Sequence, residues 1–360
     1  MANQEHYHFN ETMQIPYQII TDWTSKIFQA TGLNKEDADL VADSLVMADA
    51  RGVYSHGVLR IAIYTERILK KCVNTSARPE LIVDNGATGI VDGYNAMGQV
   101  VGNYAMHVAM EKAEKHGVSF VTARGSNHYG TCAYYAMMAL KKDMIGFSAT
   151  IGGGNLMAPW GGSDPRVGNN PFGIAIPALN HDPVVLDMAQ SIVAKGKIVM
   201  ASKTKSSIPD NWAFDRDGVP TTDPNEAING TLRPIADYKG SGIAVVIGML
   251  SSVISDAAIG ANLKDVYKDF TGGLNKGQMF LAVDLKHMTD VEAFKKRMDR
   301  EIDFVKASPT AKGTNEVYLP GEPEYVNYRQ QMQDGIKYPL EVIDNIRTIS
   351  SNLGVAAPRF

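Results

Sequence analysis

The feature that most constrains the fold is an alternation of short β-prone runs with helical patterns, which begins near residue 80. The β-prone runs are rich in branched and aromatic residues and cover 89–93, 118–123, 144–150, 172–177, 184–189 and 278–285. Apolar residues at helical spacing fall between them, at about 98–115, 132–142, 242–257 and 291–305. Such alternation predicts an α/β domain built on a substantial sheet.

At both ends of the chain, helical patterns replace this alternation. They cover about 18–31, 35–50, 58–71 and 339–353, and Asn34 is placed to cap the second. The stretch 308–324 is rich in Pro and Gly and is expected to be a connection. We therefore expect a helical subdomain formed by residues 1–78 and 307–360, beside an α/β domain of residues 79–306.

Composition excludes several classes of protein. The chain has 360 residues, 44% hydrophobic and 21% charged, with a net charge of −4, which gives no basic surface for nucleic acid or membranes. No apolar stretch is long enough to span a membrane, and the first 14 residues lack the features of a secretory signal. The two cysteines form no CxxC pair, which fits a reducing, cytoplasmic compartment. Without an HExxH motif or clustered cysteines, we expect no metal site.

The segment 54–64 carries the most informative set of side chains. Ser55 could cap the following helix, which would place His56 in its first turn and Arg60 and Tyr64 at i+4 and i+8 from His56. A histidine exchanges a proton near neutral pH, and an arginine binds a carboxylate through two parallel hydrogen bonds. Together they suit a 2-hydroxy acid. On spacing alone, a solvated helix face explains the pattern equally well.

A second histidine, His128, lies between a β-prone run and a helical pattern, where α/β folds place ligands. It is another acid/base candidate, although a turn histidine bonded to backbone is the simpler interpretation. The other six histidines lack such settings and are expected to be structural: His6, His8, His107, His116, His181 and His287.

Glycine-rich stretches at 152–154 and 161–162 would let backbone approach a ligand, or form tight turns. Yet no G-x-G-x-x-G or Walker A motif follows any expected strand, so a bound dinucleotide would not use the Rossmann fingerprint.

Lys239, just before the apolar pattern 242–257, could form an anion site or be merely exposed. Asp187 ends a β-prone run, where it could orient a histidine, bind a cofactor hydroxyl or cap the following helix. We expect the apolar pattern 242–257 itself to be a buried helix.

These same segments resemble the malate/L-lactate dehydrogenase family, which includes sulfolactate dehydrogenase, ureidoglycolate dehydrogenase and 2,3-diketo-L-gulonate reductase. The resemblance runs in family order across nearly the whole chain. Its matching stretches are RGVYSHGVLR (51–60), GSNHYG (125–130), GNNPFGIAIP (168–177), LDMA (186–189), IPDNWAFDRDGVPTTDP (208–224), YKGSG (238–242) and LPGE (319–322).

The resemblance implies a non-Rossmann NAD(P)-binding fold, which we expect to be three-layered with a mixed central sheet, and a homodimer with active sites near the subunit interface. It implies that His56 and His128 are acid/base residues and that Ser55, Arg60 and Tyr64 lie on the substrate side. The implied cofactor contacts are Gly152, Asn170, Pro171, Asp187, Met188, Ala189, Tyr238, Lys239, Gly321 and Glu322. Asn169 stands where the family usually has threonine.

The expected function is hydride transfer between a nicotinamide cofactor and C2 of a small 2-hydroxy acid, with malate ahead of other acids and NAD ahead of NADP. Arg60 would hold the carboxylate, His56 would be the primary acid/base, and His128 would polarise the same oxygen or take over the proton. Asp187 would bind cofactor or orient a histidine.

Alternatives remain open. They are ureidoglycolate oxidation, or reduction of a cyclic imine or a diketo sugar acid. A hydrolase lacks its G-x-S-x-G motif, and a non-catalytic binding protein would not need the intact set of polar side chains. The segment 151–155, Ile-Gly-Gly-Gly-Asn, replaces a more polar run found in many relatives and leaves the acid undetermined.

Overall fold

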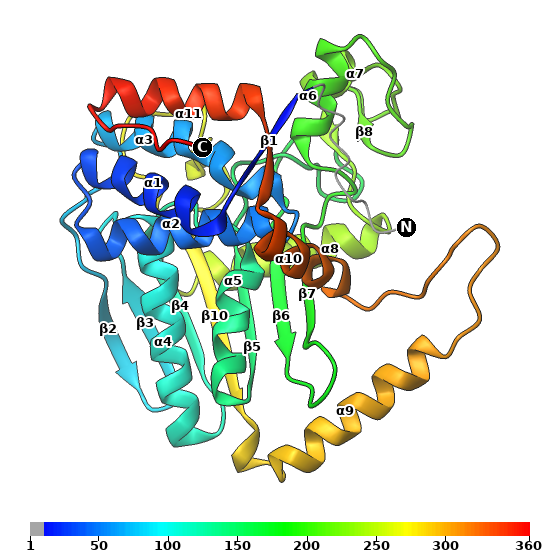
Figure 1. Cartoon of the computed structure of the whole chain (residues 1–360). Coiled ribbons are helices and arrows are strands. Elements are labelled where there is room, and N and C mark those ends of the chain that lie inside the picture. Colours follow the sequence, from blue (N-terminus) through cyan, green and yellow to red (C-terminus); the bar gives the residue numbers. More distant parts are fainter. Residues whose placement is uncertain (1–10) are drawn as a thin grey trace.

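The structure, a computed structural model, describes residues 11–360 and is organised around a seven-stranded mixed sheet (Figure 1). Its strand order is β2-β3-β4-β10-β5-β6-β7, in which only β3 and β4 run parallel among the neighbouring pairs. The strands are β2 (Glu80–Asn85), β3 (Thr88–Asp92), β4 (Phe120–Ser126), β5 (Met144–Thr150), β6 (Phe172–Ile176), β7 (Val184–Met188) and β10 (Lys276–Asp284). This mixed sheet with its helices confirms the expected α/β class.

Helices cover both faces of the sheet, because its central strands are apolar on both sides. Along β10, Phe280 and Ala282 face α4 (Gly98–His116) and α5 (Cys132–Ala136), whereas Met279 packs near Ile247 of α8 (Tyr238–Ser252). Alternate residues of a strand point to opposite faces, so β10 joins the two cores. Helix α9 (Val291–Lys306) follows β10 and extends away from the sheet (Figure 1).

A second core joins the two ends of the chain. Strand β1 (Thr12–Ile15) pairs antiparallel with β11 (Ile336–Pro339), and Trp23 donates to Ser350 Oγ at 2.8 Å. Apolar residues from both ends share one buried cluster. Figure 1 shows blue and red helices packed side by side. The helices are α1 (Tyr17–Ala30), α2 (Lys35–Ala50), α3 (Ile61–Leu69), α10 (Glu322–Asp334) and α11 (Leu340–Asn352).

A long excursion from the sheet runs between β7 and α8. It contains two short helices and a two-stranded sheet with a small apolar core of its own. Its elements are α6 (Lys195–Lys203), β8 (Ala213–Phe214), α7 (Pro224–Asn229) and β9 (Thr231–Leu232).

Several boundaries match the sequence predictions. Asn34 caps α2, accepting from Asp37 N at 3.1 Å, and β5 has the predicted bounds. Three predictions need correction. The helix expected over 132–142 is α5 followed by a 3-10 turn, Met137–Lys142. The helix expected over 58–71 begins with a 3-10 turn, Val58–Arg60, and continues as α3 to Leu69.

The third correction concerns 242–257, which is not a buried helix. One side of α8 packs on the sheet, but its other side is exposed because no element in residues 11–360 covers it. The exposed residues are Ile243, Val246, Met249, Leu250, Val253 and Ile254. The sequence also missed α10, whose hydrophobic pattern is weak, and the short strands β1, β2, β8, β9 and β11.

Candidate active site

The fold brings together two histidines that lie 72 positions apart in the sequence. The rings of His56 and His128 are nearly parallel, with centroids 5.7 Å apart and an interplanar angle of 23°. His56 ends a 3-10 turn between α2 and α3, and His128 follows β4. The sequence predicted each as an acid/base candidate, and the structure brings their two rings together.

The turn that carries His56 differs from the predicted helix start. Two consecutive 3-10 turns, Tyr54–His56 and Val58–Arg60, precede α3, and Ser55 does not cap a helix. Its Oγ instead lies 3.0 Å from Nδ1 of His56. The prediction of a cap was wrong because the chain bends at Gly57 before α3 begins. Ser55 therefore orients the imidazole rather than the helix.

A buried carboxyl beneath this turn fixes its shape. Asp49 Oδ2 accepts from Val58 N at 2.9 Å and from the Tyr338 hydroxyl at 3.0 Å. Burial raises the pKa of Asp49 to about 8. A Cβ on Gly57 would lie 1.7 Å from Asp49 Oδ1, so only glycine fits here. Sequence reasoning missed Asp49, although an acidic residue between two alanines on the inward face of α2 was a signal.

Tyr64 holds the second histidine. Its hydroxyl lies 2.6 Å from Nδ1 of His128, and Gln99 Nε2 donates to the same hydroxyl at 3.3 Å. The phenol can donate to a neutral ring or accept from a charged one, so it serves both protonation states. Because Nδ1 is engaged, Nε2 of His128 is the nitrogen left for a ligand.

Arg60 lies beside both histidines. Its Nε donates to Ser55 O at 2.8 Å, and its Nη1 donates to the Tyr267 hydroxyl. With Nε engaged, the Nη edge of the guanidinium remains for a carboxylate. The predicted substrate-side residues Ser55, Arg60 and Tyr64 are thus grouped around the two rings.

The electrostatics of this group follow from its positive charge and its enclosure. Burial, followed by the Arg60 charge, lowers the pKa of His56 to about 3. Burial also lowers the pKa of His128 well below its ordinary value, helped by Arg60, His56 and Lys276. Both imidazoles are therefore neutral near pH 7 in the free protein, and an anion bound at Arg60 would raise both pKa values.

A small pocket adjoins His128 on the side of α3. The segment 266–274 forms one of its walls, and no sequence signal pointed to that segment. The lining residues are Tyr64, Arg67, Val73, Met97, Asn127, His128, Val266 and Leu274.

Lys276, which the sequence analysis did not single out, lies buried next to this group. Its Nζ donates to Gly152 O at 2.6 Å, and burial lowers its pKa to about 7. Gly152 N in turn donates to Asn170 Oδ1 at 2.8 Å, and Asn170 Nδ2 donates to Ala244 O at 2.6 Å. Of the predicted cofactor residues, Gly152 and Asn170 thus belong to one hydrogen-bonded unit with α8. Pro171 O accepts from Thr150 N at 3.2 Å beside them.

The edge strand β7 carries two other predicted residues, Asp187 and Met188, and a third, Ala189, follows it directly. Asp187 Oδ2 accepts from Ala133 N at 2.7 Å, at the start of α5. The carboxyl reaches solvent, but the protein packed around it raises its pKa to about 6. The expectation that Asp187 might cap the following helix was wrong, because residues 189–194 are not helical and the carboxylate caps α5 instead.

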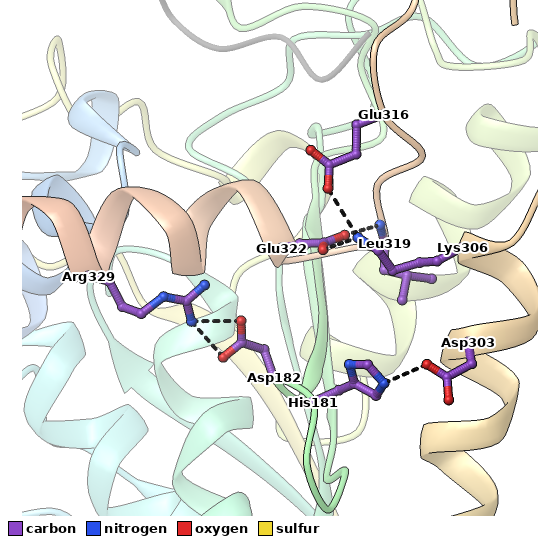
Figure 2. A network of polar contacts seen from close by, with 8 residues as sticks. All are labelled: His181, Asp182, Asp303, Lys306, Glu316, Leu319, Glu322 and Arg329. Atoms are coloured by element: carbon purple, nitrogen blue, oxygen red, sulfur yellow. Dashed lines mark hydrogen bonds and ion pairs between the residues drawn. The ribbon is translucent and has the colours of Figure 1, made fainter. Parts of the chain in front are cut away.

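The turn containing Gly321 and Glu322 lies against β7. Val185 N donates to Pro320 O at 2.9 Å, and a Cβ on Gly321 would lie 2.7 Å from Val185 O. Figure 2 shows how charged residues hold this turn: Glu322 accepts from Leu319 N at 3.0 Å and from Lys306 Nζ of α9. Arg329 of α10 binds Asp182 at 2.8 and 2.7 Å. The side chain of Glu322 is therefore engaged locally, while the backbone of Pro320 and Gly321 borders β7.

The last two predicted residues, Tyr238 and Lys239, lie exposed in the first turn of α8. The Tyr238 ring meets Trp160 edge to face, with centroids 6.2 Å apart. Ile235 N donates to Gln190 O at 2.8 Å, so the residues just before α8 bond to the residue that follows Ala189. The predicted cofactor residues at the end of β7 and those at the start of α8 are therefore neighbours.

Four histidines expected to be structural have structural contacts. His107 and His287 bond to backbone carbonyls, His181 pairs with Asp303 at 2.8 Å (Figure 2), and His116 lies against Gly86. His6 and His8 lie outside the described residues. Within 11–360, no group of three His, Cys, Asp or Glu side chains could hold a metal ion, and no helix is long and apolar enough to cross a membrane.

Comparison with known proteins decides the family. Residues 15–347 match the model of the malate/L-lactate dehydrogenase family. The chain belongs to the malate/L-lactate dehydrogenase family. It is 34% identical over 330 residues to malate/(S)-sulfolactate dehydrogenase of Methanothermus fervidus, covering 92% of this chain and 95% of that one. It is also 34% identical over 322 residues to ureidoglycolate dehydrogenase (NAD(+)) of Escherichia coli K12, covering 89% and 90%.

Solved structures agree. The malate dehydrogenase of Pyrococcus horikoshii superimposes with a TM-score of 0.89 at 31% identity, covering 98% of this chain and 99% of that one. These matches confirm the family resemblance and establish a hydroxy-acid oxidoreductase. Dehydrogenases of this family use a nicotinamide cofactor.

Proposed function

We propose that this family member transfers a hydride between nicotinamide and C2 of a small 2-hydroxy acid, with malate as the first substrate to test and NAD as the cofactor. The observation that carries the proposal is the grouping of Arg60 with His56 and His128. Malate is favoured because the Methanothermus fervidus and Pyrococcus horikoshii relatives are dehydrogenases of malate by name, and NAD is favoured because the name of the Escherichia coli relative includes NAD(+).

Arg60 would bind the carboxylate through its Nη edge, since its Nε is held by Ser55 O. The added negative charge would raise the pKa of the histidines from their depressed values. A histidine near its working pKa then accepts the hydroxyl proton as the alcohol is oxidised and returns it in reduction. We assign this exchange to the histidine pair, with Nε2 of His128 as the oriented donor and acceptor and His56 beside it.

The predicted cofactor residues suit a nicotinamide dinucleotide. A bound nicotinamide would supply the hydride acceptor and donor at C4. Gly152 presents no side chain at this position. A Cβ on Gly152 would lie 2.3 Å from Asn169 Oδ1, so a larger residue does not fit there. Beyond β7, Gln190 Oε1 and Ser191 Oγ are buried without hydrogen-bond partners in the described structure, which fits polar groups awaiting a ligand. Lys239 and the exposed start of α8 would suit phosphate oxygens.

The test is an oxidation screen of malate, L-lactate, sulfolactate and ureidoglycolate with NAD and NADP, together with nicotinamide fluorescence titrations. We expect NADH to bind and malate to give the highest kcat/KM. Cofactor binding without turnover of any acid would contradict the proposed reaction. Turnover of another acid alone would correct only the substrate.

A second candidate reaction is oxidation of ureidoglycolate, which the Escherichia coli relative's name supports. Reduction of a cyclic imine or a diketo sugar acid is a further alternative within the family. The three consecutive glycines of the segment 151–155 offer few side-chain donors and single out none of these substrates. A keto-acid and imine panel with NADH distinguishes these reactions.

We also propose a cytoplasmic homodimer, with residues 1–78 and 307–360 as the helical substrate and dimerisation part and 79–306 as the nicotinamide-binding domain. Cys72 and Cys132 are free and buried, which suits a reducing compartment. The exposed apolar side of α8 supports a second copy as partner, because water-exposed patches of this kind mark interaction sites. Light scattering should give twice the chain mass, and Val246→Glu should lower it; a monomeric wild type would contradict the proposal.

A further inference from the structure

A segment outside every predicted site lies over the substrate side of the histidine pair. Residues 263–275 form the second half of the connection from α8 to β10. Arg67 of α3 holds this segment through three backbone carbonyls: it donates to Val266 O at 3.1 Å, Asp269 O at 2.7 Å and Gly272 O at 2.9 Å. Arg67 is buried, so these bonds fix the segment rigidly.

The same side of α3 organises three parts of the site. Arg60 at the N-cap of α3 and Tyr64 and Arg67 within α3 follow one another at helical spacing, so they share one side. Arg67 holds the segment, Tyr64 holds His128, and Arg60 meets the segment at Tyr267. The pocket beside His128 is bounded by the same segment through Val266 and Leu274. The segment is therefore part of the wall of the site.

Tyr267 is the residue of this segment that reaches Arg60. Its backbone N donates to Asp265 Oδ1 at 2.8 Å, which sets the turn, and its hydroxyl accepts from Arg60 Nη1. The Arg60 guanidinium lies 5.6 Å from the ring centroid. Because the hydroxyl accepts from Arg60, its own hydrogen is free. Tyr267 is 54% exposed, so that hydrogen is open to a ligand.

We propose that Tyr267 is a substrate-binding residue that, together with the Nη edge of Arg60, binds the substrate carboxylate, its hydroxyl donating to a carboxylate oxygen. The inference rests on the proposed function, since it needs an acid bound at Arg60. Ser55 O engages Nε, so the carboxylate has only the Nη edge of Arg60, and the Tyr267 hydroxyl lies on Nη1 at that edge. A phenol donor there completes the anion site.

The test compares Tyr267→Phe with wild type in acid oxidation. Loss of one hydrogen bond to a charged group should raise KM for the acid about tenfold. The carboxylate is bound equally in ground and transition states, so kcat should change little. Affinity for NADH, measured by fluorescence, should stay the same. Tyr104→Phe, an exposed tyrosine on α4, is the matched control and should leave KM unchanged.

A double-mutant cycle separates direct binding from an effect on Arg60 alone. In an Arg60→Ala background, the Tyr267→Phe penalty should persist if the phenol touches the substrate. A penalty that vanishes there, or an unchanged KM in the single variant, overturns the proposal while the reaction itself stands. If wild type oxidises no acid at all, the proposed function fails first, and that outcome is recognised before any variant is made.

Discussion

The Tyr64 hydroxyl lies 2.6 Å from Nδ1 of His128, and this contact joins the first helix after the His56 turn to the loop after β4. It orients one ring of the histidine pair and directs Nε2 toward the site. The residues on either side of the bond come from the helical part and from the sheet, so the proposed acid/base pair forms only when both are assembled.

Removal of this hydroxyl should therefore impair proton transfer more than binding. In Tyr64→Phe, His128 loses its partner and its fixed orientation, and we expect kcat to fall roughly 10- to 100-fold, within the usual contribution of a positioned acid/base. Steady-state kinetics with cofactor titration check this. Tyr104→Phe serves again as the control, and a Tyr64→Phe enzyme with normal kcat would show that the bond has no role in turnover.

The charge of Arg60 should set the pH profile. Burial and, after it, the Arg60 charge lower the pKa values of His56 and His128, so removal of Arg60 should raise both pKa values. The rate of acid oxidation declines toward low pH as the histidines become protonated, and in Arg60→Gln this acid limb of the pH–rate profile should move to higher pH. KM for the acid should also rise about 100-fold, because the carboxylate loses its partner. Arg60→Lys keeps the charge and should keep the limb. A limb that stays in place in Arg60→Gln would exclude this coupling.

Asp49 should make stability fall as pH rises. Burial raises the pKa of its carboxyl from 3.8 to about 8, so between these values the folded chain binds a proton that the unfolded chain has lost. The free energy of unfolding then decreases with increasing pH across that window. Asp49→Asn mimics the protonated carboxyl and keeps an acceptor for Val58 N.

Melting curves from pH 5 to pH 9 provide the measurement. The Tm of wild type relative to Asp49→Asn should drop as pH rises, by about 2 °C for each kcal/mol in a chain of this size. Parallel curves for the two proteins would mean that the carboxyl does not titrate in this range.

Lys276 should act in the opposite direction. Burial lowers its pKa from 10.5 to about 7, so above pH 7 the folded chain has released a proton that the unfolded chain keeps. Stability should rise with pH between about 7 and 10.5. Lys276→Met should abolish that rise, and the exposed Lys296→Met is the control. If both variants follow the wild-type slope, Lys276 remains charged when folded.

The sequence predicted the strands and the candidate side chains better than the connections. Periodicity located the central strands, and Asn34 marked α2, because these signals are local. The rest depends on contacts between distant segments. Asp49 meets Gly57 and Tyr338, and Lys276 meets Gly152, only after folding. Ser55 looked like a cap because a serine before a helical pattern usually is one, and the bend at Gly57 could not be seen without Asp49 beneath it. Neither Arg67 nor Tyr267 bears any pattern that marks it as part of the site.

The measurement that tests the account most directly is the rate of NADH formation from malate by wild type, His56→Ala and His128→Ala, with NADH affinity measured in parallel. The account predicts activity in wild type and a fall in kcat of roughly 100-fold or more in at least one variant, because the pair carries the proton, with NADH affinity nearly unchanged in both. Near-normal turnover in both variants would contradict the assignment of the site.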